Sequence, residues 1–313
     1  MLRAEALLLI IAGVIMPSAL QSAEETLPVA HITSGGATIE VTFAPGKINL
    51  PQSKVLAWIS SAADSVSAYY GHFPVPHGRI LVRPVEGRSG VFNGTTYGYQ
   101  GGFTRISIGQ LTTQDELDND WMMTHELLHL AFPDISGEEH HWIEEGMATY
   151  IEPIARAQIG ATRPERVWGE MARYMPQGLP QYGDQGLDNT DSWASTYWGG
   201  ALFWLVADVQ IRERTNNKKG VQDAMRAILN AGGSIREEWP IENALQVGDK
   251  ATGTKVLTDL YNRMKAKAVQ TDLNDLWRKL GIQVKNNVVT FDDQAPLANI
   301  RKAITASRKT GRT

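Results

Sequence analysis

Apolar and polar residues alternate in the first part of the chain, whereas apolar residues recur at helical spacing in most of the second part. The alternation predicts strands at residues 29–32, 38–43, 79–83 and 103–108. Gly35-Gly36 lies between the first two strands and predicts a hairpin turn. Helical spacing through Val55, Ile59 and Val66 predicts a helix over residues 51–70.

The glycine-rich segment 87–102 contains an Asn93-Gly94 turn signal and is expected to be a mobile loop. It lacks the lysine of a phosphate-binding loop, which argues against a nucleotide site. Beyond Ile154 the spacing predicts helices at 165–175, 193–215, 221–229, 254–266 and 273–280, and a late strand at 284–291. The Gly/Pro-rich connection 176–192 is expected to overhang a cleft.

The segment His125-Glu126-Leu127-Leu128-His129 is an HExxH motif in a helical, apolar context. We expect Trp121, Leu128 and Phe132 to bury one face of this helix, and Pro133 to end it. Histidines four residues apart point from the same side of a helix, so His125 and His129 can bind one metal ion together. Glu126 then sits beside that metal and is free to hold a water molecule. The alternative is a buried helix with two hydrogen-bonded histidines.

A third ligand is expected from the segment Trp142-Ile143-Glu144-Glu145-Gly146-Met147-Ala148. HExxH followed by Trp-x-x-Glu-Gly-x-Ala resembles the gluzincin metallopeptidases, which include the aminopeptidase N relatives, the glycyl aminopeptidases and the peptidase MA-like domains. In the gluzincin pattern the glutamate before the glycine is the ligand, which implies Glu145. Glu144 competes for this role, but it lies about 100° round the helix and cannot face the metal equally well. His140 and His141 are closer in sequence, and we favour a solvent-exposed position for both.

The same resemblance implies roles for two further residues. Glu152 lies two helical turns beyond Glu145, where the family carries a carboxylate that holds a ligand histidine from behind. Tyr197-Trp198-Gly199-Gly200 resembles the Tyr-x-Lys-Gly helix of the glycyl aminopeptidases, whose tyrosine donates to the oxyanion. Gly199 stands where that family has lysine, so a positive charge is missing near the site. An ordinary surface glutamate and a buried core tyrosine are the alternatives.

The resemblance also implies a fold: a two-lobed, thermolysin-like α+β metallopeptidase with the zinc site between the lobes. We expect an α/β lobe over residues 24–137, ending in the zinc helix, and a mostly α-helical lobe over 138–298. The predicted strand 103–108 would form the sheet edge that pairs with the substrate backbone, with Gly101 and Gly102 binding substrate. Aminopeptidase N relatives carry an acidic residue there for the free amine of the substrate, and residues 99–104 contain none.

Composition agrees with a large globular protein and excludes several classes. The 313 residues are 42% hydrophobic and carry a formal net charge of −4, so nothing basic enough for nucleic-acid binding stands out. The chain has no cysteine, which excludes disulfides, a thiolate zinc site and a cysteine nucleophile.

The N-terminus resembles an export signal. Arg3 precedes an apolar run from Ala6 to Met16 that is short of the ~20 residues needed to span a bilayer, and small residues follow up to Ala23. We expect residues 1–23 to be a signal peptide, and the mature protein to be periplasmic or secreted without stable membrane insertion. An uncleaved anchor is the alternative. At the other end, residues 299–313 are basic and are expected to form a flexible, solvated tail.

These observations predict a zinc metallopeptidase with one Zn²⁺ per chain, acting on exported peptides or proteins. Zinc would bind His125, His129, Glu145 and a water molecule, and Glu126 would take the proton of that water and pass it to the leaving nitrogen. Tyr197 would stabilise the oxyanion. Two other hypotheses stay open: an aminopeptidase with an amine anchor from elsewhere, and a non-catalytic zinc-stabilised binding or scaffold protein. The sequence makes no prediction of the oligomeric state.

Overall fold

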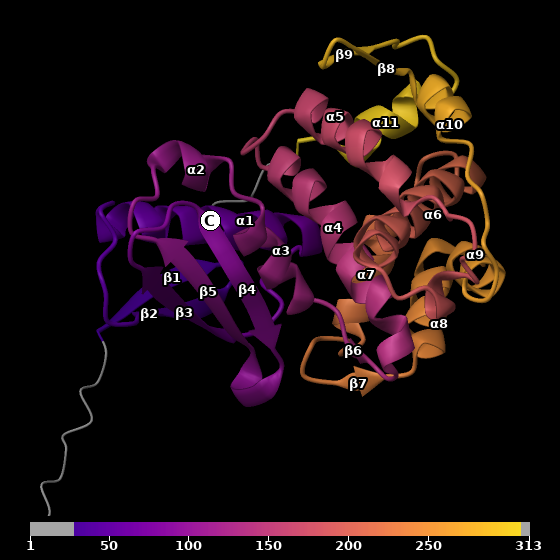
Figure 1. The fold of residues 1–313 in the computed structure, drawn as a ribbon. Coiled ribbons are helices and arrows are strands. Elements are labelled where there is room, and N and C mark those ends of the chain that lie inside the picture. The colour runs from indigo at the N-terminus through magenta and orange to yellow at the C-terminus, as the bar shows by residue number, and fades with distance from the viewer. Residues whose placement is uncertain (1–27, 308–313) are drawn as a thin grey trace, which may run out of the picture.

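A computed structural model describes residues 28–307, which fold into a sheet-containing first part and a helical second part (Figure 1). The predicted signal segment 1–23 lies outside the described residues. The first part contains β1 (Val29–Ser34), β2 (Ala37–Phe43), α1 (Gln52–Tyr70), β3 (His77–Val85), β4 (Val91–Tyr97), β5 (Phe103–Gly109), α2 (Gln114–Asp118) and α3 (Met122–His129). The predicted mixture of strands first and helices later is confirmed, so the protein belongs to the α+β class.

The second part is built from helices, with two short strand pairs. Its elements are β6 (Asp134–Ile135), α4 (His141–Gln158), α5 (Pro164–Tyr174), a π-helical turn (Ser195–Gly199), α6 (Gly200–Arg214), α7 (Val221–Asn230), β7 (Glu238–Trp239), α8 (Ile241–Thr252), α9 (Val256–Met264), α10 (Leu273–Leu280), β8 (Ile282–Lys285), β9 (Val288–Phe291) and α11 (Ala298–Ile304). The sequence pattern did not predict α8, nor the short helices α2 and α11.

The five strands of the main sheet are ordered β1-β2-β3-β5-β4, with parallel pairing of β2 with β3 and of β3 with β5. Alternate residues of the central strands, such as Ile39, Ile80 and Ile106, are completely or almost completely buried. Helix α1 packs along this apolar face and also contacts α3 and α4, so a single core joins the sheet to the helices (Figure 1).

The expectations for the glycine-rich segment and the sheet edge are wrong. Residues 91–97 form β4 rather than a mobile loop, and β4 pairs antiparallel with β5. The edge of the sheet on this side is therefore β4, and β5 lies inside the sheet. The strand escaped prediction because the pairing shifts register between Phe92 and Thr95, where Asn93 has a φ of 53°. Such a bulge interrupts the alternation that reveals a strand.

The prediction of a solvated tail is wrong for the residues up to 304. The chain there forms α11, and Arg301 is only 2% exposed. Its guanidinium donates to the carbonyl oxygens of Leu280 and Gly281, at 2.8 Å and 3.0 Å, and lies over the ring of Phe291. A basic residue is buried here because it satisfies carbonyls left open at the end of α10 and forms an ion pair with the carboxylate of Asp293. No helix among residues 28–307 is long and apolar enough to cross a membrane.

A buried charge network ties α4 to α6 and α7. The carboxylate of Asp208 accepts hydrogen bonds from the hydroxyl of Tyr150 at 2.8 Å, Nε of Arg212 at 2.8 Å and the backbone N–H of Val221 at 2.9 Å. Both charged side chains are almost fully buried. Asp208 thus neutralises Arg212 and holds the first residue of α7.

Replacing Asp208 with Ala is expected to lower the free energy of unfolding by about 3–5 kcal/mol, since the Arg212 charge would remain buried without its partner. Urea denaturation followed by circular dichroism measures this change. The control is Lys219→Ala, which removes a half-exposed ion pair with Asp223 and should cost less than about 1 kcal/mol. Equal losses in the two variants would contradict the assignment.

Candidate metal centre and active site

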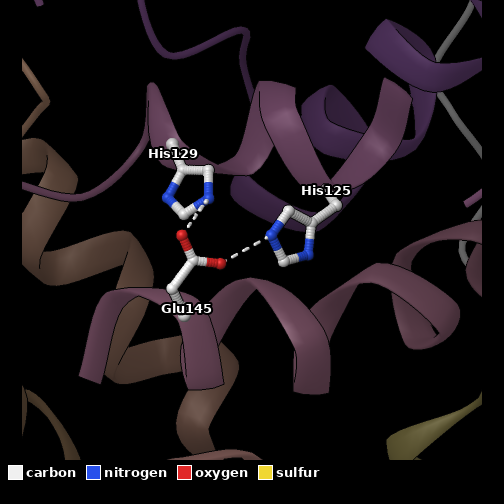
Figure 2. Close-up of side chains that lie close together, drawn as sticks. All are labelled: His125, His129 and Glu145. Carbon is white, nitrogen blue, oxygen red and sulfur yellow. Dashed lines mark hydrogen bonds and ion pairs between the residues drawn. The ribbon is translucent and has the colours of Figure 1, made fainter. Parts of the chain in front are cut away.

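Two helices from the two parts of the chain bring the predicted metal ligands together. His125 and His129 project from α3, and Glu145 projects toward them from α4 (Figure 2). Helix α3 begins where it does because the carboxylate of Asp120 accepts the backbone N–H groups of Met122 and Met123, at 3.2 Å and 3.0 Å. These are two of the N–H groups that have no partner within a helix, so Asp120 fixes the start of the helix that carries both histidines.

The three side chains fit a zinc ion. One ligand atom from each of His125, His129 and Glu145 lies within 4.8 Å of the others. Nε2 of His125 is 3.0 Å from Oε2 of Glu145, and Nε2 of His129 is 3.7 Å from Oε1 (Figure 2). Zinc bonds of about 2.0–2.2 Å in a tetrahedral arrangement place ligand atoms roughly 3.3–3.6 Å apart, and the two separations, which run to different oxygens of Glu145, lie close to this range.

The charge of Glu145 suits a metal ligand. Burial alone would raise the pKa of its carboxyl group, but the hydrogen bond from His125 and the charges of the nearby histidines lower that pKa to about 2. Glu144, the competing candidate, is turned away: Oε1 of Glu144 accepts the backbone N–H of Ile135 at 2.8 Å. Glu144 therefore supports the short strand β6 and is not in the metal cluster of the described residues.

The two histidines just before α4 differ in their surroundings. The side chain of His141 is 60% exposed, as expected, although its Nε2 lies 3.5 Å from Oε1 of Glu145. His140 is largely buried, in contrast to the expectation, with Nδ1 3.2 Å from Oδ1 of Asp188. His141 is thus an exposed neighbour of the cluster, and His140 is held by a different carboxylate.

Glu126 is buried beside the metal cluster and is held by β4. The hydroxyl of Thr96 donates to Oε2 of Glu126 at 2.9 Å. Gly94 leaves room for this carboxylate, since a Cβ atom there would lie 2.6 Å from Oε1 of Glu126. Burial raises the pKa of Glu126, whereas His129 and Thr96 oppose this shift. Sequence reasoning missed Gly94 and Thr96, because it assigned their strand to a loop.

Tyr197 lies in the π-helical turn that precedes α6. π-Helical turns are rare and occur frequently at functional sites. The ring of Tyr197 stacks near that of His125, with centroids 6.1 Å apart, and Tyr197 lines the same cavity as Glu126 and Glu145. Burial raises the pKa of its hydroxyl, and both carboxylates raise it further, so the hydroxyl stays protonated as a donor.

A close helix crossing sets the distance between Glu145 and Tyr197. Gly146 on α4 and Gly200 on α6 face each other, and a Cβ atom on Gly146 would lie 2.2 Å from the carbonyl carbon of Gly200. These glycines belong to the two motifs that carry the family resemblance. Gly199, where the resembled family has lysine, is buried, and a Cβ atom there would lie 3.0 Å from Leu187. A longer side chain does not fit without movement of this neighbour.

Three predicted site residues are placed differently from the expectation. Glu152 is buried on α4, but its carboxylate accepts from the guanidinium of Arg156 at 3.0 Å. Within residues 28–307, Nδ1 of His125 has no hydrogen-bond partner, so Glu152 does not hold this ligand histidine from behind. Gly101 and Gly102 precede β5 and do not line the cavity at the metal cluster, whose sheet wall is Gly94, Thr95 and Thr96 of β4.

Comparison with known proteins identifies solved structures that have a similar fold. No protein-family model and no curated protein matches the chain. Among solved structures, an aminopeptidase N family protein from Idiomarina loihiensis is similar with a TM-score of 0.65 and 15% identity, covering 86% of this chain and 53% of that one. An M1 zinc metallopeptidase from Deinococcus radiodurans has a TM-score of 0.51 and 17% identity, covering 78% of this chain and 52% of that one.

These likenesses show that the chain has the fold of the M1 zinc metallopeptidases, the class that the gluzincin resemblance implied. The chain spans about half the length of these two structures.

Proposed function

We propose that this protein is a zinc-dependent peptidase that hydrolyses peptide bonds within exported proteins or peptides. The observation that carries the proposal is the cluster of His125, His129 and Glu145 beside a buried carboxylate, Glu126, that is not part of it. A purely structural metal site has no use for such a base. The fold shared with M1 zinc metallopeptidases supports the same reaction class.

A bound zinc ion would polarise the substrate carbonyl and lower the pKa of water. Glu126 takes a proton from the attacking water and returns it to the leaving nitrogen, and Thr96 holds the Glu126 carboxylate in place for both steps. The hydroxyl of Tyr197 donates to the carbonyl oxygen as negative charge develops there. The sheet-containing and helical parts supply the two walls of a thermolysin-like, two-lobed site.

The edge strand β4 suits an extended peptide. Among residues 28–307 no strand pairs with its outer edge beside Glu126, although the backbone N–H of Gly94 donates to Sδ of Met122 at 3.3 Å, and an added strand would gain main-chain hydrogen bonds along this edge. The residues of β4 are Val-Phe-Asn-Gly-Thr-Thr-Tyr, without an acidic group for the free amine of a substrate. This favours cleavage inside a chain over removal of single N-terminal residues.

The first test is metal content. The purified protein is expected to hold about one zinc per chain, and His125→Ala or His129→Ala should each lose it. Elemental analysis by mass spectrometry measures both. His141→Ala is the matched control, because this exposed histidine lies near Glu145 but outside the ligand cluster. Protein that holds no zinc after mild purification, and takes none up on addition, would remove the basis of the proposal.

A second test separates internal cleavage from aminopeptidase action. Peptides with free and with acetylated N-termini are expected to be cut at similar rates, since β4 offers no acid to the amine. Mass spectrometry of the products gives kcat/KM for each member of the pair. A strong requirement for the free amine would restore the aminopeptidase reading, with Asp134 and Glu144, which line the same cavity, as the first candidate anchors.

Export is also proposed, on the basis of residues 1–23. N-terminal sequencing of the protein secreted by its cell or recovered from the periplasm tests it, with cleavage expected near Ala23. An intact Met1 in the exported protein would favour the uncleaved anchor.

A further inference from the structure

A second cavity, of about 340 Å³, adjoins the catalytic cavity and plays no part in the steps above. His125 and Tyr197 both line it, and Tyr197 lines the catalytic cavity as well, so the two cavities share the Tyr197 side chain as a wall beside the metal cluster. Its volume is at the lower end of the range of small-molecule pockets, about 300–1,000 Å³. The question is what this cavity holds.

Two tryptophans at the cavity are left largely exposed. Trp193 is 62% exposed and stacks on Tyr197, with centroids 5.4 Å apart and planes at 25°. Trp121 is 49% exposed and contacts His125 edge to face at 5.3 Å, although helical spacing predicted it to be buried. Each indole therefore offers apolar surface that the fold does not cover, directly beside a residue of the proposed active site.

The rest of the lining combines aromatic and apolar side chains with two neutral polar residues, Thr149 and Gln177, and four charged residues. Tyr174 and Trp198 stack with centroids 5.4 Å apart, and Met171 is buried beside them. The charged groups of the lining form two ion pairs: Arg156 with Glu152 at 3.0 Å, and Arg166 with Glu170 at 2.8 Å. Neither sign of charge is in excess, so the cavity suits an uncharged guest.

We infer that this cavity receives a large apolar side chain of the substrate, preferably aromatic, from a residue next to the scissile bond. The inference rests on the proposed function and gives its substrate class: polypeptides with Phe, Tyr, Trp or Leu at one position flanking the cleaved bond. Aromatic rings bind each other in the stacked and edge-to-face arrangements that the exposed faces of Trp193 and Trp121 present. A small or charged side chain would leave these faces in water.

The test is a set of acetylated peptides that differ by Phe or Ala, placed first on one side and then on the other side of the cleaved bond. At one of the two positions the native enzyme should prefer Phe, on the order of 10–100-fold in kcat/KM, the usual scale for hydrophobic pockets. Trp193→Ala should reduce this ratio several-fold. The ratio of kcat/KM for the Phe peptide to kcat/KM for the Ala peptide is the decisive quantity. Loss of the ring stacking on Tyr197 can lower the rate for both peptides, but it does so to the same extent and leaves this ratio unchanged.

Trp121→Ala, which removes the indole beside His125, is the second variant, in case Trp193→Ala does not fold. Tyr182→Ala is the matched control, since this fully exposed aromatic residue does not line the cavity, and it should leave the ratio unchanged. An active enzyme that cuts the Phe and Ala peptides equally well at both positions would overturn the inference and leave the proposed function standing. A preference for Phe that stays unchanged in both the Trp193→Ala and the Trp121→Ala proteins would also overturn the inference.

A binding measurement separates the two proposals when no peptide is cut. Isothermal titration calorimetry of the Glu126→Gln protein with the same peptides should show tighter binding of the Phe member. Tighter binding of that peptide without any hydrolysis by the native enzyme would support the cavity and overturn the proposed function. Equal binding of both peptides would overturn the cavity assignment.

Discussion

Glu126→Gln should lower kcat by about 10²–10⁴-fold while zinc content stays at the native level, since Glu126 serves as the base and not as a ligand. Glutamine keeps the size of the side chain and can still accept the Thr96 hydroxyl, so the fold and the metal cluster should not change. What it cannot do is take a proton from water. Peptide turnover and elemental analysis on the same preparation measure the two effects together.

The matched control is Glu144→Gln, which neutralises a neighbouring carboxylate in the same cavity without touching the proposed base. Near-native turnover in a folded, zinc-loaded Glu126→Gln protein would remove the proposed role of Glu126. It would favour the non-catalytic alternative, in which the metal only stabilises a binding or scaffold protein. Loss of zinc from this variant would instead mean that Glu126 belongs to the ligand set.

The metal cluster could be predicted because its residues lie close together in the sequence. His125, Glu126 and His129 are fixed relative to each other by one turn of helix, and Glu145 follows on the next long helix. The choice of Glu145 over Glu144 came from the family pattern, and the structure gives its physical reason. Only Glu145 faces α3, whereas Glu144 is held by the backbone of β6.

The errors arose where the arrangement depends on contacts far apart in the sequence. In the sequence, Asn93-Gly94 is typical of a turn, but in the structure it is a bulge in β4. The glycine is needed there because it leaves room for the Glu126 side chain of α3. Gly101 and Gly102 were assigned to the sheet edge only because β4 was missing from the prediction. The buried Arg301 is similar: its partners are the carbonyl groups at the end of α10 and the carboxylate of Asp293.

Glu152 and Trp121 show the limits of transferring a pattern residue by residue. Glu152 occupies the expected helix face, but the guanidinium of Arg156 lies one turn further along α4 and pairs with it. Burial raises the pKa of Glu152 to about 7 in spite of this partner. Trp121 has the spacing of a core residue, yet it lies just before the first residue of α3 and opens onto a cavity. Glu152 is thus claimed by a partner on its own helix, and Trp121 is left open because its position precedes the helix whose spacing predicted its burial.

Tyr197→Phe is expected to lower kcat by about 10²–10³-fold with little change in KM, the usual loss for one oxyanion donor. The hydroxyl is protonated, half-buried and beside Glu145, so it can donate where charge develops in the transition state. Phenylalanine keeps the ring that stacks on Trp193 and His125, and therefore the packing of the π-helical turn. Zinc content should stay the same, because Tyr197 is not a proposed ligand. Steady-state kinetics with an acetylated peptide gives kcat and KM separately.

The matched control is Tyr261→Phe, which removes a partly buried hydroxyl bonded to Asp188 at 3.2 Å, away from the metal cluster. Turnover of this control should be close to native, which separates the loss of an oxyanion donor from the general effect of deleting a tyrosine hydroxyl. If the folded, zinc-loaded Tyr197→Phe protein is as active as the control, the Tyr-x-x-Gly match reflects only the close crossing of Gly146 and Gly200. A rise in KM at unchanged kcat would instead make Tyr197 a substrate-binding residue, with the same hydroxyl used equally in the ground state and the transition state.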